Sequence, residues 1–273
     1  MMDLSICYRT LGFKHSPFTI TPDTELFFPS KNHVIALSHM QYSLTSGGFT
    51  LITGEVGLGK TLLCRELLRK CDKNIRTAYI FNPLQTINDL LRAIHFDLTG
   101  KKPQARTTAQ LHDAIYKALL IIASRGERAA IIIDEAHRLN PELLEALRLI
   151  SNIETEKEKL LSLILVGQPE LSKILSSVEM RPLAQRISVR YVLQPLNFKA
   201  TRQYIRHRLK LCSIKQDDFY FSTSALLLAY WYSRGAPRRI NQICDRALLA
   251  AFANERHFVS MFTLRKAARE VLY

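Results

Sequence analysis

The sequence has few cysteines and no long apolar run. Its five cysteines are scattered through 273 residues, and none forms a C-x-x-C pair. That pattern argues against a zinc site or a disulfide framework, and the odd count fits a reducing compartment. The apolar stretches, such as 118–123 and 129–133, are far shorter than the roughly eighteen residues that cross a bilayer. The N-terminus also lacks the apolar segment of a signal peptide, so we expect a cytoplasmic chain without a membrane span.

The sequence also has fewer acidic than basic residues. The chain has 24 Asp and Glu against 38 Lys and Arg, which gives a formal net charge of +14. A hydrophobic content of 47% with 23% charged residues excludes a disordered chain or a fibre. The positive excess points to a polyanionic partner, either nucleic acid or an anionic membrane surface, and composition does not choose between them.

The apolar pattern predicts an α/β layered domain, and no internal repeat or low-complexity segment interrupts it. Short apolar runs without alternation are typical of strands covered by helices on both faces of a parallel sheet. Residues 129–133 form such a run, and further strands are expected near 49–53, 77–81, 160–166 and 187–193. Apolar residues spaced by three or four predict the intervening helices, which we expect over 32–46, 60–71, 86–98, 107–124 and 141–153.

The strand pattern stops after Pro195. Residues 1–195 are therefore expected to form the α/β domain, with an irregular N-terminal segment over 1–30 and a solvated loop over 154–159. Residues 196–273 are expected to form a smaller all-helical domain. Its predicted helices cover 199–212, 223–234, 237–254 and 263–272.

A glycine-rich stretch at 54–61, called the P-loop below, completes the pattern G-x-x-x-x-G-K-[ST] between a predicted strand and a predicted helix. Glycines allow the backbone N–H groups to point at phosphate oxygens, and the following helix adds a positive end. Lys60 would reach the β- and γ-phosphates, and the Thr61 hydroxyl would hold Mg²⁺. A chance turn is the alternative, but the strand–turn–helix context argues against it. The predicted nucleotide-binding residues are Gly54, Glu55, Val56, Gly57, Leu58, Gly59, Lys60, Thr61 and Leu62.

A second motif follows the predicted strand 129–133, where two carboxylates are adjacent. Asp134 would bind the Mg²⁺ shell, and Glu135 would orient and polarise the attacking water. Acidic residues are common where a strand enters a loop, but after a P-loop the pair predicts hydrolysis of a nucleoside triphosphate. His137 lacks partners at metal-ligand spacing, so we expect a structural or loop role for it.

These two motifs belong to a longer series. They are followed by the stretches 167–171, 185–187 and 235–238. In this order the motifs resemble those of AAA+ ATPases. More narrowly, the chain resembles the ExeA/GspA-type ATPases of bacterial secretion and type IV pilus systems, and among them those of mannose-sensitive haemagglutinin (MSHA) pilus biogenesis. The similarity includes residues 17–18, 21–23 and 47–49.

The resemblance implies a P-loop parallel sheet flanked by helices, with a helical lid domain after it. It implies ATP and Mg²⁺ as ligands, and ATP hydrolysis by a homo-oligomer, for which a ring is one arrangement. The implied partners are membrane-complex proteins of a pilus or secretion machine. Secretion relatives continue into a membrane span, whereas this chain stops at the end of the lid. We therefore expect a cytoplasmic protein that reaches the inner membrane through a partner.

The resemblance also suggests roles for single residues. Gln168 lies at the sensor-1 position, where many AAA+ proteins have Asn, and a plain turn residue is the alternative. Arg186 matches the arginine finger that completes a neighbour's site; Arg181 is its rival, and an ordinary surface arginine is the alternative for either. Arg238 matches the sensor-2 arginine. Asn82 is a candidate for holding the catalytic glutamate inactive, with a turn role as the alternative.

Most of the charge excess lies in the C-terminal part. Residues 196–273 contain 14 basic and 5 acidic side chains, against 24 and 19 in residues 1–195. Within that part, Lys199, Arg202, Arg206 and Lys210 form one helical stripe. One explanation of this stripe is a helix face that is exposed to solvent and has no partner. The functional one is contact with DNA, acidic lipids or an acidic partner, so a DNA-associated AAA+ regulator of the transposition-ATPase kind stays as the alternative to an assembly ATPase.

Overall fold

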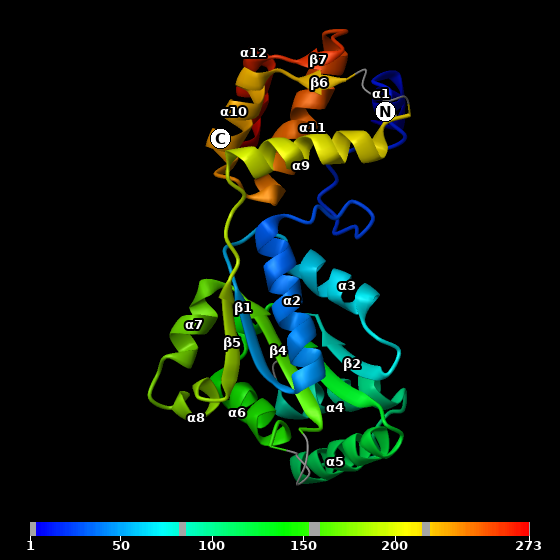
Figure 1. Ribbon diagram of the computed structural model, residues 1–273, viewed down its shortest axis with the longest axis vertical. Coiled ribbons are helices and arrows are strands. Elements are labelled where there is room, and N and C mark those ends of the chain that lie inside the picture. The colour runs from blue at the N-terminus through cyan, green and yellow to red at the C-terminus, as the bar shows by residue number, and fades with distance from the viewer. Residues whose placement is uncertain (1–3, 82–85, 153–158, 215–218, 273) are drawn as a thin grey trace. The chain divides into compact units, whose positions relative to one another are not determined.

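The computed structural model describes residues 4–81, 86–152, 159–214 and 219–272. Their contacts separate two compact units, whose elements are labelled in Figure 1. The α/β unit comprises Lys31–Glu55 and Leu63–Leu193, and the helical unit comprises Met1–Ser30, Val56–Leu62 and Gln194–Tyr273. A functional division near residue 195 remains a prediction.

A five-stranded sheet is the centre of the α/β unit, with the strand order β2-β3-β4-β1-β5 and every pair parallel. Its strands are β1 (Gly48–Thr53), β2 (Ile75–Ile80), β3 (Arg128–Ile133), β4 (Leu161–Gly167) and β5 (Ile187–Val192). All residues of β1 and β4 are buried, because helices cover both faces. The expected parallel sheet is confirmed, and each strand lies where its apolar run predicted it.

Helices flank this sheet on both sides. They are α2 (Lys31–Ser46), α3 (Lys60–Lys70), α4 (Ile87–Thr99), α5 (Thr108–Ser124), α6 (Pro141–Ile150), α7 (Pro169–Leu175) and α8 (Arg181–Ala184), with a 3₁₀ turn, η1, at Ala136–Arg138. Helix α2 crosses one face, against β1, β4 and β5, whereas α4 and α5 pack against β2 and β3 (Figure 1). The odd-numbered apolar residues of β1, β3 and β4 share one core with α4 to α8.

Local sequence explains where these helices begin. The Thr86 hydroxyl accepts the Asp89 N–H at the start of α4, and Thr107 forms a capping box with Gln110 at the start of α5. Helix α6 begins after the Asn140 cap and ends at Ile150, so it is shorter than the predicted 141–153. Residues 153–158, which include most of the predicted loop at 154–159, lie outside the described residues.

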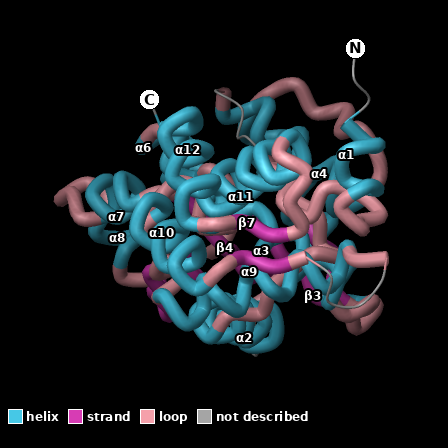
Figure 2. The backbone as a smooth tube through the Cα atoms, turned by 90° about the horizontal axis from the view of Figure 1, so that it is seen from above, coloured by secondary structure: helices cyan, strands magenta, loops and turns pink. Residues whose placement is uncertain are grey.

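The helical unit contains five helices in its described part. They are α1 (Leu4–Thr10), α9 (Phe198–Cys212), α10 (Thr223–Ser233), α11 (Pro237–Ala253) and α12 (Met261–Leu272). Two short strands, β6 (Tyr220–Phe221) and β7 (Phe258–Val259), form a parallel pair that the sequence did not reveal, and β7 lies beside α11 (Figure 2). Two residues are too short for a period-2 pattern to be visible. Within the described ranges, no helix is both long and apolar enough to cross a bilayer.

The segment 1–30 was predicted to be irregular, and this is wrong for α1 (Leu4–Thr10), which is a helix. A buried arginine holds the irregular part that follows α1 in this unit. Arg208 on α9 is 3% exposed, and its Nε donates to the Pro17 carbonyl at 2.6 Å. A second guanidinium nitrogen donates to the Thr19 carbonyl at 3.2 Å, and Asn241 donates to the same oxygen at 2.9 Å. The segment therefore follows one defined path although it contains no helix or strand over 17–19.

Candidate nucleotide site

The P-loop starts at the carboxyl end of β1, the sheet edge at which open α/β folds bind ligands. The Gly54 N–H donates to the Gly167 carbonyl at 3.2 Å, which ties the start of the loop to the end of β4. Gly57 and Gly59 have φ values of 81° and 92°, a region that L side chains rarely adopt. Helix α3 then begins at Lys60, and the first N–H groups of a helix suit a phosphate group.

Lys60 and Thr61 form the first turn of α3. Lys60 is buried, with 6% of the residue exposed. Thr61 is half-buried and follows directly in the chain. A buried ammonium and a hydroxyl at the positive end of a helix fit the phosphates and the cation of a nucleotide.

Arg238 lies against this loop, within the helical unit. It is the second residue of α11, after Pro237 at the first helical position, and its backbone N–H donates to the Gly57 carbonyl at 3.1 Å. Its side chain is exposed. The predicted sensor-2 residue and the predicted P-loop are thus adjacent, as a nucleotide-contacting role requires.

The acidic pair lies at the end of β3, the strand next to β4. Asp134 is fully buried; one carboxylate oxygen accepts the Glu135 N–H at 2.9 Å, and the other lies 3.5 Å from the Tyr79 hydroxyl. Burial raises the pKa of that tyrosine well above its ordinary value, and the nearby charges of Cys64 and Asp134 add to the effect. The phenol therefore stays a hydrogen-bond donor beside the carboxylate.

The residues present fit Mg²⁺. No cluster of three or more His, Cys, Asp or Glu side chains occurs among the described residues, so a cage made only of these protein ligands is not available there. Mg²⁺ in phosphate-binding sites instead uses one or two carboxylates, phosphate oxygens and water. Asp134 and Thr61 are the candidate protein ligands of Mg²⁺ in this chain.

Glu135 has an unusual backbone. Its φ of 53° and ψ of 32° place a non-glycine residue in the left-handed region, directly before η1. Such a conformation typically stores about 1–3 kcal/mol and occurs mainly where function requires a fixed side chain. The Glu135 side chain is 31% exposed, so a water molecule can reach its carboxylate. This arrangement fits the predicted water-orienting role.

Gln168 begins α7 but makes no side-chain cap for that helix. Its amide nitrogen instead lies 3.0 Å from Nε2 of His137, and the same Nε2 lies 3.6 Å from the Glu135 carboxylate. Gly167 permits this approach, because a Cβ there would lie 3.0 Å from the His137 backbone nitrogen. The sequence analysis predicted a structural or loop role for His137 and no part in the site. The position of His137, two residues after Glu135, was the feature of the sequence that could have indicated its place there.

The two finger candidates are both exposed. Arg181 is the first residue of α8, and Arg186 lies between α8 and β5. Exposure suits a side chain that acts on a neighbouring subunit, and it does not separate the two candidates. Asn82, the proposed inhibitory residue, lies outside the described residues.

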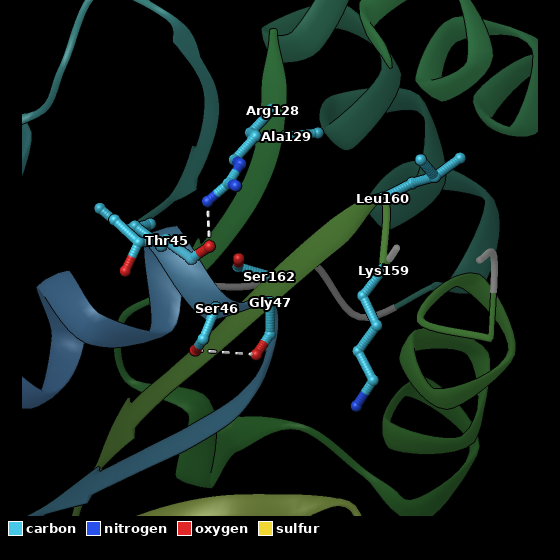
Figure 3. Close-up of a pocket in the computed structure, with 9 residues that line it drawn as sticks. Thr45, Ser46, Gly47, Arg128, Ala129, Lys159, Leu160 and Ser162 are labelled. Atoms are coloured by element: carbon cyan, nitrogen blue, oxygen red, sulfur yellow. Dashed lines mark hydrogen bonds between the residues drawn. The ribbon is translucent and has the colours of Figure 1, made fainter. Parts of the chain in front are cut away.

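A cavity of about 330 Å³ lies at the opposite edge of the sheet (Figure 3). The cavity lies at the amino ends of β3 and β4, and Arg128 and Lys159 are among the residues that line it. There the Arg128 guanidinium donates a hydrogen bond to the Thr45 carbonyl. Because ligands of open α/β sheets bind at the carboxyl ends of the strands, this cavity is not the candidate nucleotide site.

Comparisons with known proteins find an AAA domain in part of the chain. Residues 43–175 match the family described as an AAA domain. The Cdc6p structure of Pyrobaculum aerophilum superimposes with a TM-score of 0.72 at 19% identity, over 92% of this chain and 72% of that one. The structure of the Aeropyrum pernix ORC1 protein in complex with DNA gives 0.69 at 18% identity, over 94% and 69%. At such identities the two structures show the fold alone. Together with the sheet and the P-loop, these comparisons show the fold of an AAA domain over residues 43–175.

A relative with a curated description is more similar in sequence than these structures are. The chain is 41% identical to General secretion pathway protein A of Aeromonas hydrophila over 261 residues. The matched region is 95% of this chain and 47% of that protein, so the chain spans about half the length of its curated relative.

Proposed function

We propose that the chain binds ATP with Mg²⁺ and hydrolyses it to ADP and phosphate. The observation that carries the proposal is the meeting of three features at the ends of adjacent strands. Buried Asp134 and strained Glu135 follow β3, while Gly167 at the end of β4 accepts the hydrogen bond from Gly54 at the start of the P-loop.

Each proposed residue has one task. The backbone of 54–62 binds the phosphates, Lys60 neutralises charge on the β- and γ-phosphates, and Thr61 and Asp134 hold the metal. Bound Mg²⁺ supplies charge neutralisation at the phosphate oxygens. Glu135 orients the attacking water and receives its proton, the Gln168 amide contacts the γ-phosphate or the water, and Arg238 contacts the nucleotide. Arg186 acts on the site of a neighbouring copy, which makes a homo-oligomer, such as a ring, the active form.

The cellular role we propose is support of a type IV pilus or secretion machine, in the manner of the MSHA-pilus ATPase MshM. The identity to General secretion pathway protein A supports this role. Its partners would be membrane-complex proteins, and the chain would be cytoplasmic and peripheral at the inner membrane through one of them.

Hydrolysis and assembly are tested with one pair of proteins. The wild-type chain should hydrolyse ATP only with Mg²⁺ and should elute as a larger species with ATP than with ADP. Glu135→Gln should bind ATP and assemble but not hydrolyse. In the source organism, deletion should remove surface pili or secretion, and Lys60→Ala should fail to restore them. Normal pili and secretion in the deletion strain would reject the cellular role and leave the ATPase proposal intact.

A second candidate function, DNA-associated regulation, follows from one surface. Lys199, Arg202, Arg206 and Lys210 are all exposed on α9, opposite the buried face that contains Arg208. No ion pair or hydrogen bond joins these four side chains to other described residues. Their regular spacing suits a row of phosphates, and a similar fold was solved in complex with DNA.

Salt dependence tests this surface. If each cation contacts a phosphate, replacing all four by glutamine should reduce the slope of log K against log salt by about 3–4. Lys101→Gln with Lys102→Gln, two exposed cations of the α/β unit, is the control and should leave the slope unchanged. An ATPase rate that is the same with and without duplex DNA, together with an unchanged slope, would reject this candidate and favour an acidic protein or lipid.

A further inference from the structure

One ring nitrogen of His137 faces two side chains that the proposed function uses. Its Nε2 lies 3.0 Å from the amide nitrogen of Gln168 and 3.6 Å from a carboxylate oxygen of Glu135. The side chain is only 16% exposed, and the buried Nδ1 has no hydrogen-bond partner among the described residues. A histidine that merely filled space would not place its polar atom between these two groups.

The chemistry of the ring allows only one of the two contacts at a time. The amide nitrogen of Gln168 is a donor, so Nε2 accepts from it and the ring proton is on Nδ1. Donation to Glu135 would instead require the proton on Nε2. In the neutral ring these two arrangements exclude each other, so the state of Gln168 determines whether His137 can hold Glu135.

The backbone keeps the ring in this place. His137 is in η1, which packs against β4 and α7, and the left-handed Glu135 sets the direction of that turn. On the other side, Gly167 leaves no room for a side chain, since a Cβ there would lie 3.0 Å from the His137 nitrogen and 3.1 Å from a Leu171 methyl. The His137 backbone therefore packs closely against the end of β4.

We propose that His137 is a positioning residue that couples Gln168 to Glu135. While the amide is bound to the ring, it is unavailable to the γ-phosphate and the carboxylate is not held. When the amide turns to the phosphate, Nε2 becomes a donor and fixes the Glu135 carboxylate for the water. The net change is the loss of one proton at Nδ1 and the gain of one at Nε2, which leaves the ring neutral. This proposal rests on the proposed ATPase function.

A kinetic cycle tests the coupling. His137→Ala should lower kcat by about 10- to 100-fold, as loss of a residue that orients a catalytic group typically does, with KM for ATP within about twofold. The double variant with Gln168→Ala should lose more activity than the two single losses combined, because each single variant also relieves the resting contact between the ring and the amide, and the double variant relieves it only once. His137→Gln, whose amide can reach the position of Nε2, should recover part of kcat. The control His257→Ala removes an exposed histidine of the helical unit.

Additive losses in the double variant would overturn the coupling, and so would a fall in kcat that His137→Gln does not reduce. If the fall in kcat of His137→Ala is accounted for by a fall in its thermal stability, the role of His137 is structural. That result would also overturn the coupling.

The imidazole itself gives a readout that is independent of activity. Nitrogen NMR of the His137 ring, assigned by comparison with His137→Ala, should show the proton on Nδ1 without nucleotide. It should move to Nε2 with Mg²⁺ and a non-hydrolysable ATP analogue. The same tautomer in both states would reject the coupling while the Glu135→Gln test of hydrolysis stands. Wild-type hydrolysis by Glu135→Gln would instead reject the proposed function.

Discussion

Arg238 and Gly57 are held together by their backbones. The Arg238 N–H donates to the Gly57 carbonyl at 3.1 Å, and a Cβ added to Gly57 would lie 2.8 Å from that of Arg238. The start of α11 therefore packs directly on the P-loop, and only glycine allows this distance. A nucleotide bound by the loop would have the first turn of α11 beside it, which links the occupancy of the loop to the position of that helix.

Gly57→Ala tests this contact. Alanine there must adopt a φ of 81° and also displace Arg238, so we expect weaker ATP binding in addition to a loss of stability. Gly126→Ala is a matched control, because its φ is 72° and nothing lies within 4 Å of the added Cβ. Both variants should lose about 1–2 kcal/mol from the backbone strain, and only Gly57→Ala should lose affinity in a calorimetric titration. Equal affinities would show that the contact does not matter for the nucleotide.

Lys60→Ala should abolish nucleotide binding. The buried ammonium at the start of α3 is the candidate charge for the phosphates, and no shorter side chain can replace it. Fluorescence titration with a labelled ATP measures the effect, and Lys73→Ala, at an exposed position beyond the same helix, should bind as the wild type does. Retained affinity in Lys60→Ala, with an unchanged melting temperature, would contradict the assignment.

The finger candidates can be separated because a finger acts on a neighbour. Arg186→Ala should bind ATP normally and lose hydrolysis by about 10³-fold, the lower range for removal of an arginine finger, whereas Arg181→Ala should remain active. Mixing Arg186→Ala with Lys60→Ala should restore part of the activity, since each chain supplies what the other lacks. If Arg181→Ala is the inactive variant and regains activity when mixed with Lys60→Ala, Arg181 is the arginine finger instead of Arg186.

The sheet could be predicted because its signals are local. Uniformly apolar runs mark β1, β3 and β4, and the glycines and Lys60 of the P-loop form one continuous motif. The acidic pair was also predictable, because it follows a strand directly in the chain.

The His137 contact could not be predicted in the same way. It forms because β3 and β4 are neighbours, which brings together residues 31 positions apart, and because Gly167 lets η1 approach. Strand order and close backbone approach leave no periodic signal in a single sequence. The short helices α7 and α8 were missed for a related reason, since too few turns are present to show a period. Likewise, the stripe on α9 was visible, but the burial of Arg208 on its other face depends on carbonyl groups near the N-terminus.

Arg208→Met should destabilise the helical unit and release the N-terminal segment. The substitution keeps much of the apolar stem but leaves the Pro17 and Thr19 carbonyls without the guanidinium that they share. We expect a loss of about 2–4 kcal/mol, in the range for removal of a buried charged donor. Arg206→Met, an exposed position on the same helix, should change stability by no more than about 0.5 kcal/mol. Chemical unfolding measures both values, and limited proteolysis should cut the Arg208→Met chain first near residues 17–19. If the two variants unfold at the same denaturant concentration and resist proteolysis equally, Arg208 does not hold the segment.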